Sequence, residues 1–475
     1  MKSTETYPLR CGLVNVLRHE RRLKGKEMVT PEPKQVERAI KLTYVQTMLS
    51  AVFGASTGGM FLIGFAIDLG ADNVLLGLMS TIPAFFVVFQ LLAAWLVENK
   101  ISRKKLTVVF ALVTPLCWFF IAAIPLFGDA LSKWMRFAVL ISTIAIVTLA
   151  AQFAGNARAS WLGELIPEER RGRFFGYCAM FAGVVGAGFA VIEGRFLDII
   201  RSRGLLAYTA LFFFGILFGL ASAVLNIPQP DCPLPGSLRK TDFRSLVANA
   251  LRNRHFMSLA VVHAVLALGS IAGPFSAAYC LRDVGLTFFQ LGLLNSVGTA
   301  ALLLSSPLWG KVVDKFGCRP VLIVGLLTIA PCAGIWFAIP PQAVAHALWL
   351  LPWTNFVAGV GNAAVSISIA TLMYKTSKPE GRSVQFALYS IFVSLVAAPM
   401  PVLGGWMVTA LQNAGWNIDL RVTFYCSSIF VFAAALVATM LREAQSVSPQ
   451  TLAFVHLPGS IMTLFRGSTT RRNAS

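Results

Sequence analysis

Twelve long apolar segments run through this chain, and they restrict its fold more than any other feature. Hydrophobic residues make up 56% of the 475 residues and charged residues 13%, with a mean hydropathy of +0.70, values typical of a polytopic membrane protein. About 20 apolar residues cross a bilayer as a helix, and no segment alternates as a membrane barrel strand does. We therefore predict an all-α membrane protein whose twelve transmembrane helices cover approximately residues 40–67, 73–97, 106–127, 136–163, 174–198, 206–228, 256–281, 286–309, 320–340, 343–373, 383–411 and 421–441.

The second half of the chain repeats the first at a nearly constant offset. A set of glycines, aspartates and leucines recurs 215 positions later, and a polar hinge recurs at 216. Unrelated helices do not keep such an offset, so the pattern predicts two six-helix bundles related by an internal repeat. The recurring pairs are Gly54 with Gly269, Gly58 with Gly273, Asp68 with Asp283, Gly70 with Gly285, Leu76 with Leu291, Gly77 with Gly292, and Leu78 with Leu293.

The repeat and the apolar segments divide the chain into five parts. We expect a basic N-terminal tail at 1–39, a first six-helix bundle at 40–228, a linker at 229–254, a second bundle at 255–441 and a C-terminal tail at 442–475. The linker begins with closely spaced prolines, which disfavour regular structure.

The net charge of +19 is confined to one side of the predicted membrane protein. If the tails and the loops after even-numbered spans share a side, that side holds 33 of the 40 Lys and Arg and 14 of the 21 acidic residues, so 33 − 14 = +19. The other side holds 7 of each and is neutral, 7 − 7 = 0. This positive-inside pattern predicts a multi-pass protein of the inner or plasma membrane with both termini cytoplasmic. It argues against nucleic-acid binding, and we expect the first span to serve as a retained insertion signal.

The hinge from Gly310 to Arg319 is a short polar segment between two apolar runs. Its sequence, GKVVDKFGCR, resembles the GxxxDxxGxR signature of the major facilitator superfamily, which joins the second and third helices of a six-helix half on the cytoplasmic side. The segment from Ala94 to Arg103 keeps the acid and the base at the same spacing but lacks both glycines. The resemblance implies twelve helices in two bundles and transport by alternating access.

The resemblance also implies a gating role for these hinges. Asp314 and Arg319 are expected to pair across a turn permitted by Gly310 and Gly317, and to latch the outward-open state; the inward-open state must break those contacts. Glu98 and Arg103 keep the pair in the first half, where Ala94 and Ile101 replace the glycines.

Spans 1, 4, 7 and 10 line the central cavity in this family, so the resemblance directs attention to their polar residues. Gln152 and Asn156 follow Thr148 at intervals of four, on one face of span 4; Asn355, Asn362 and Ser366 share a face of span 10. An amide facing lipid is costly, so these faces point to a cavity or to another helix. The candidate substrate-binding residues are Gln152, Asn156, Asn355, Asn362, His263 and Tyr279; interhelical packing is the alternative role for each.

No acidic or basic residue lies near the middle of any predicted span. Proton-coupled transporters usually place a carboxylate there, because burial adjusts its affinity for protons. The nearest coupling candidates are Asp68 and Glu193, both expected near the outer surface. The absence of a charged residue near the middle of the spans favours a neutral or amphipathic solute. Pro401, Gly404 and Gly405 resemble half of an antiporter pattern, in span 11 rather than span 5, and are interpreted as packing residues.

We therefore predict a secondary active or facilitative transporter for a small solute, acting as a monomer in the bilayer. A proton-coupled exporter that uses the outer carboxylates is one alternative, and a non-transporting sensor on the same fold is another. An enzyme is disfavoured because no catalytic constellation is evident. The spacing of Cys and His predicts no metal site, no phosphate-binding loop is present, and we expect no cofactor.

Overall fold

The computed structural model describes residues 33–98, 102–231, 248, 251–377 and 382–441, and regular structure in these residues is helical. Residues 1–32, the C-terminal tail and most of the linker lie outside this part, and the last seven residues of the predicted N-terminal tail belong to α2. The main helices are α2 (Pro33–Thr57), α3 (Gly59–Asp68), α4 (Asn73–Phe86), α5 (Gln90–Glu98), α6 (Arg103–Ala123), α7 (Lys133–Leu165), α8 (Glu168–Ile200), α9 (Leu205–Val224), α11 (Arg254–Leu268), α12 (Phe275–Ala278), α13 (Phe288–Phe316), α14 (Cys318–Ile335), α15 (Val344–Thr376), α16 (Arg382–Ala397), α17 (Pro399–Asn413) and α18 (Arg421–Ala438).

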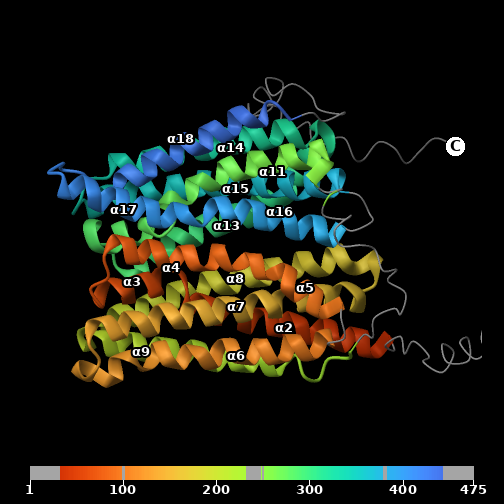
Figure 1. Ribbon diagram of the computed structural model, residues 1–475, viewed down its shortest axis with the longest axis horizontal. Helices are drawn as coiled ribbons and strands as arrows, with labels where there is room; N and C mark the ends of the chain where they lie inside the picture. Colours follow the sequence, from red (N-terminus) through yellow and green to blue (C-terminus); the bar gives the residue numbers. More distant parts are fainter. Residues whose placement is uncertain (1–32, 99–101, 232–247, 249–250, 378–381, 442–475) are drawn as a thin grey trace, which may run out of the picture.

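The helices form twelve candidate membrane spans, as predicted. Spans 1, 2, 7 and 11 each combine successive helices: α2 with α3, α4 with α5, α11 with α12, and α16 with α17. The spans lie roughly parallel in two stacked bundles, the first six below and the last six above in Figure 1. The first and last described residues of both bundles lie at one end of the molecule. We call this the linker end and the opposite end the far end.

Spans 1 and 7 are both interrupted at the glycines that the repeat pairs. In span 1, α2 ends at Thr57 and α3 begins at Gly59, whose φ of +52° is a conformation that favours glycine. In span 7, the helix tightens into a 3-10 turn at Gly269–Ala272 before Pro274. Discontinuous helices in corresponding positions of two repeats commonly line the binding site of a transporter.

Span 11 is interrupted between α16 and α17, where Pro399 and Pro401 follow each other closely. Pro401 has no N–H to donate to the carbonyl of Ala397, and the Ser270 hydroxyl of span 7 donates to that oxygen at 3.2 Å. The neighbouring carbonyl of Ala398 accepts from Thr81 of span 2 at 2.7 Å, across the two bundles. The break is thus satisfied by side chains, as a break inside a membrane requires.

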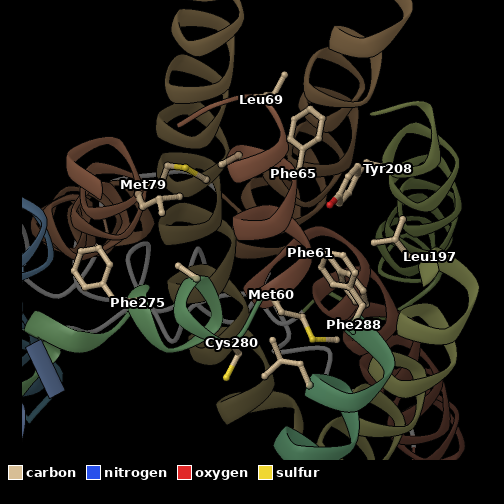
Figure 2. Packing of buried hydrophobic residues seen from close by; sticks show 14 of the residues in the cluster. Met60, Phe61, Phe65, Leu69, Met79, Leu197, Tyr208, Phe275, Cys280 and Phe288 are labelled. Carbon is tan, nitrogen blue, oxygen red and sulfur yellow. The ribbon is translucent and has the colours of Figure 1, made fainter. Parts of the chain in front are cut away.

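The largest buried apolar cluster joins the two bundles at the far end. It takes residues from spans of both halves, including Phe61, Phe65 and Tyr208 of the first and Phe275 and Phe288 of the second. Figure 2 shows Phe61 beside Phe288, and their ring centroids are 5.8 Å apart. In the described part of the chain, the remaining buried clusters each belong to a single bundle. The structure therefore represents a state in which the bundles are joined at the far end.

Candidate functional site: a cavity between the bundles and its far-end seal

Two helix pairs close the far end, α4 with α17 and α8 with α13. A Cβ atom on Gly405 of α17 would collide with the carbonyl oxygen of Asn73, at the start of α4. One on Gly77 of α4 would collide with the carbonyl oxygen of Pro401. Glycine is required here because the backbones themselves are in contact.

The second pair repeats this arrangement with the roles of the two halves exchanged. A Cβ atom on Gly194 of α8 would lie 2.7 Å from the carbonyl oxygen of Phe288, at the start of α13. One on Gly292 of α13 would lie 2.9 Å from the carbonyl oxygen of Ala190. Gly77 and Gly292 are partners in the sequence repeat, so the duplication produced two symmetry-related contacts. We call Gly77, Gly194, Gly292 and Gly405 the seal glycines.

Polar contacts across the bundles reinforce the seal. The carboxylate of Asp198, near the end of α8, accepts from the backbone N–H groups of Phe288 and Phe289 at 3.0 and 2.9 Å. These are orphan donors at the N-terminus of α13, where a negative charge is favourable. Arg282 of span 7 donates to the Asn73 side chain of α4 at 3.0 Å. Sequence reasoning missed Asp198, because its partner is the backbone of a distant helix.

The predicted hinge pair is not formed in this state. Asp314 is exposed and makes no hydrogen bond or ion pair in the described part of the chain, while Arg319 donates to the carbonyl oxygen of Thr439 at the end of α18. Gly317 ends α13 with a φ of +91°, a conformation that favours glycine. Gly310 lies inside α13. In the other half, Arg103 is buried at the start of α6, and the Glu98 side chain lies outside the described residues.

A cavity of about 370 Å³ lies between the bundles, below the seal. Small residues of α2 and α8 form one wall, among them Ala51, Gly54 and Gly186. Asn295, Ser296 and Thr299 of α13 form the polar wall. The sequence interpretation missed Asn295 and Thr299 because it ranked spans 1, 4, 7 and 10 only. Their spacing of four, the same signal that selected Gln152 and Asn156, was present in span 8.

The predicted amide face of span 4 is turned toward span 2. Gln152 accepts a hydrogen bond from Gln90 at 2.9 Å, and Asn156 donates to the backbone carbonyl of Gln90 at 3.0 Å. Both amides therefore join helices in this state, which is the packing role left open for them.

The predicted face of span 10 is different, because its amides have no intramolecular partner among the described residues. Asn362 and Ser366 are exposed, and Asn355 is partly exposed. Trp353, on the same helix, is also exposed. It lies nine residues before Asn362, about two and a half helical turns, so the two side chains leave the helix on opposite faces. The tryptophan face suits lipid, and the asparagine face suits a hydrated space.

His263 and Tyr279 are both occupied by packing contacts. Nδ1 of His263 lies 2.8 Å from the Tyr389 hydroxyl. Tyr279 is fully buried at the far end, and its hydroxyl donates to the carbonyl of Ile339 at 2.6 Å. The prediction that Tyr279 contacts solute does not fit this state, because the seal covers it.

The two coupling candidates have different surroundings. Asp68 is exposed at the far end and accepts from the Tyr208 hydroxyl at 2.6 Å. Glu193 is only 3% exposed. Its Oε1 lies 2.6 Å from the Ser56 hydroxyl, and its Oε2 has no hydrogen-bond partner. Among the described residues, no group of three or more His, Cys, Asp or Glu could hold a metal ion.

Comparison with known proteins agrees with this architecture. The family model described as Major Facilitator Superfamily matches residues 257–468. This match covers most of the second bundle, and over that part the chain is similar to this family. Over 133 residues, it is 30% identical to the multidrug resistance protein MdtH of Citrobacter koseri, a segment covering 28% of this chain and 30% of that relative. The MdtH of Salmonella newport is 29% identical over 139 residues, 29% of this chain and 31% of the relative. The matched segment spans about a third of these relatives.

Solved structures share the fold at low sequence identity. A D-xylose-proton symporter has a TM-score of 0.67 at 15% identity, covering 86% of this chain and 98% of its own. The nucleoside transporter NupG has a TM-score of 0.60 at 12% identity, covering 86% and 98%. A bacterial homologue of the lysosomal transporter Spinster, in an inward-facing and unoccupied conformation, has a TM-score of 0.61 at 17% identity, covering 86% and 97%. These likenesses establish the fold.

Proposed function

We propose that this protein is a secondary transporter that moves a small neutral or amphipathic solute by alternating access. The observation that carries the proposal is the pair of symmetry-related glycine contacts that close one end of a cavity between the two bundles. Contacts between backbones at both helix pairs are suited to opening and closing as the bundles rock. The relatives are named for drug resistance and the structural neighbours for nucleoside and sugar transport, so the solute class stays open.

Purified protein in liposomes, offered a panel of labelled metabolites and drugs, tests this proposal. We expect saturable flux of at least one solute. A sensor on the same fold would bind a solute without flux, and an enzyme would convert it. Either result would contradict the proposal.

The orientation follows from the charge distribution. We propose that the linker end is cytoplasmic, that the protein acts as a monomer in the inner or plasma membrane, and that the far-end-closed state is inward-facing. Asp314 and Arg319 do not contact each other in this state, which suits a hinge latch that forms only in the outward-open state. A cysteine at Ser237, in the linker, should resist impermeant thiol reagents in intact cells and react after permeabilisation; labelling from outside would overturn the orientation.

A second feature favours proton coupling through Glu193. The Ser56 hydroxyl lies 2.6 Å from Glu193 Oε1 and 2.9 Å from the carbonyl oxygen of Val52. A hydroxyl has one hydrogen, so Ser56 either shares it between the two acceptors or donates to Val52 while a protonated Glu193 donates to Ser56; only the second arrangement gives two full hydrogen bonds. Burial of an unpaired carboxylate is costly, which also favours the neutral acid. Gly194, the next residue, is a seal glycine, so opening the far end would admit water near Glu193 and release the proton.

We predict that Glu193→Gln abolishes proton-driven accumulation and leaves downhill exchange within about twofold of wild type, since glutamine keeps the hydrogen bond to Ser56 but cannot release a proton. Flux with and without an imposed pH gradient in liposomes measures both quantities. Asp68→Asn is the control and should keep accumulation, because Asp68 is exposed and outside the seal. Accumulation that persists in Glu193→Gln and fails in Asp68→Asn would place the coupling at Asp68.

The difference between the amides of spans 4 and 10 gives a paired prediction. We expect Asn362→Ala to lower solute affinity about 5- to 150-fold, because a solute group that bonds Asn362 would be left unsatisfied at about 1–3 kcal/mol. Gln152→Ala should instead lower the melting temperature by a few degrees with little change in affinity, because it removes the bond to Gln90. Titration calorimetry and thermal unfolding measure the two effects. If Gln152→Ala lowered the affinity while Asn362→Ala lowered only the melting temperature, the binding face would lie on span 4.

A further inference from the structure

Within the described part of the chain, Arg158 has no hydrogen-bond or ion-pair partner, although it lies inside a spanning helix. It lies seven residues before the end of α7 and is partly exposed. A guanidinium group stays charged under physiological conditions and carries five donors. A charged residue in a membrane span is costly and usually faces a partner or a water-filled cavity. The position of Arg158 on its helix decides between these.

The face of α7 that carries Arg158 continues from a buried residue of the cluster that joins the two bundles. Ile144 is buried in the cluster that joins the bundles at the far end. Ala151, Gly155 and Arg158 follow Ile144 by 7, 11 and 14 residues, spacings that keep them on nearly the same face. Ala151 and Gly155 are exposed, although the face is buried at Ile144. Toward the linker end, this face therefore lines the space between the bundles rather than lipid.

The neighbours of Arg158 connect it to the cavity below the seal. Arg158 lies close enough to Cys178 of α8 for electrostatic interaction, and Cys178 contacts Thr47 of α2. Thr47 precedes Gly54, which lines the cavity, by seven residues, so both lie on one face of α2. Tyr44, on the same face, supplies an aromatic ring near Cys178. Arg158 thus lies on the linker-end side of the cavity, beside apolar and aromatic surface.

We propose that Arg158 binds an oxyanion of the transported solute, and that the solute class is therefore an amphipathic anion, an apolar body that carries a carboxylate or a similar group. This inference rests on the proposed function and narrows its solute class. The guanidinium fork matches a carboxylate in bidentate geometry, and such bonds are roughly twice as strong as neutral ones. Neither Lys nor a neutral donor reproduces this match. The apolar walls of the cavity would hold the remainder of the solute.

A pair of probes that differ only in charge tests the proposal: 1-naphthoate and 1-naphthamide, titrated calorimetrically into purified protein in neutral detergent. We expect wild type to bind the carboxylate at least tenfold more tightly than the amide. Arg158→Gln should remove this preference by weakening naphthoate alone, and Arg158→Lys should keep part of it. Arg254→Gln is the matched control, since Arg254 is exposed at the start of α11, and it should retain the full preference.

The outcomes distinguish failure of the anion-site proposal from failure of the proposed transport function. Equal binding of both probes by wild type, or a preference that survives Arg158→Gln, overturns the anion site while leaving transport of neutral solutes intact. If Arg158→Gln does not fold, comparing wild type with Arg158→Lys still tests the proposal. The preference for naphthoate over naphthamide should be smaller in the Lys variant than in wild type, and an unchanged preference would contradict the anion site. Repeating the titration with added phosphatidylglycerol tests a lipid phosphate as the occupant: naphthoate preference that disappears there overturns the assignment to solute. A preference that persists supports it.

Discussion

In Gly405→Ala, we expect the population with an open far end to increase about 5- to 150-fold and transport to fall accordingly. The added Cβ collides with the carbonyl oxygen of Asn73, at the start of α4, where two backbones meet. Overpacking of this kind typically costs 1–3 kcal/mol. The cost applies only while the far end is closed, because the two helices separate when it opens. Spin labels on cysteines at Phe127 and Trp416, both exposed on opposite bundles at the far end, would report the separation by pulsed dipolar spectroscopy.

Gly163→Ala is the matched control. Gly163 lies within α7, and a Cβ there meets nothing within 4 Å, so the variant receives the same increase in helix propensity without a collision. We expect its distance distribution to match wild type. Gly292→Ala, at the symmetry-related contact, should resemble Gly405→Ala. Identical distributions in all three variants would mean that the seal glycines do not limit closure.

Much of the fold could be predicted from the sequence because it is encoded in local and repeated patterns. Apolar runs define the twelve spans, and the fixed offset between Gly58 and Gly273 reveals the repeat. The interruptions of spans 1 and 7 at these glycines were not predicted. The repeat also pairs Gly77 with Gly292, although the two-fold seal was not predicted from this pair. Its partners Gly405 and Gly194 were not paired beforehand, since helix packing between bundles leaves no signal at a fixed offset.

The site was harder to predict because it depends on a small rotation of each helix. Gln152 and Asn362 carry similar amides on spans that both line the cavity in the family, yet one bonds Gln90 and the other is exposed. A polar face predicts only that lipid is avoided. The sequence placed Glu193 toward the outer end of span 5 but did not show whether it is buried; its burial follows from the packing of α8 against α2 and α13.

Asp198→Ala should open the far end in a different way, by removing an attraction rather than adding a collision. Its carboxylate accepts from two backbone N–H groups of α13, and hydrogen bonds to charged groups contribute about 1.5–3 kcal/mol each. The N–H groups regain water only when the bundles separate, so the loss applies to the closed state. We expect a 10-fold or larger increase in the open population, on the order of the 5- to 150-fold shifts typical of such couplings, measured with the same spin-label pair.

Thr287→Ala distinguishes a link between bundles from ordinary helix capping. Thr287 caps the same end of α13 from within its own bundle, as part of a capping box with Gln290, and its loss should cost about 1 kcal/mol of stability. Because Thr287 and Gln290 stay together whether the far end is open or closed, that cost falls on both states equally. We therefore expect a lower melting temperature in both variants but a shifted distance distribution only in Asp198→Ala. A shift of similar size in Thr287→Ala would mean that the state of the α13 terminus, rather than its bond to α8, controls the far end.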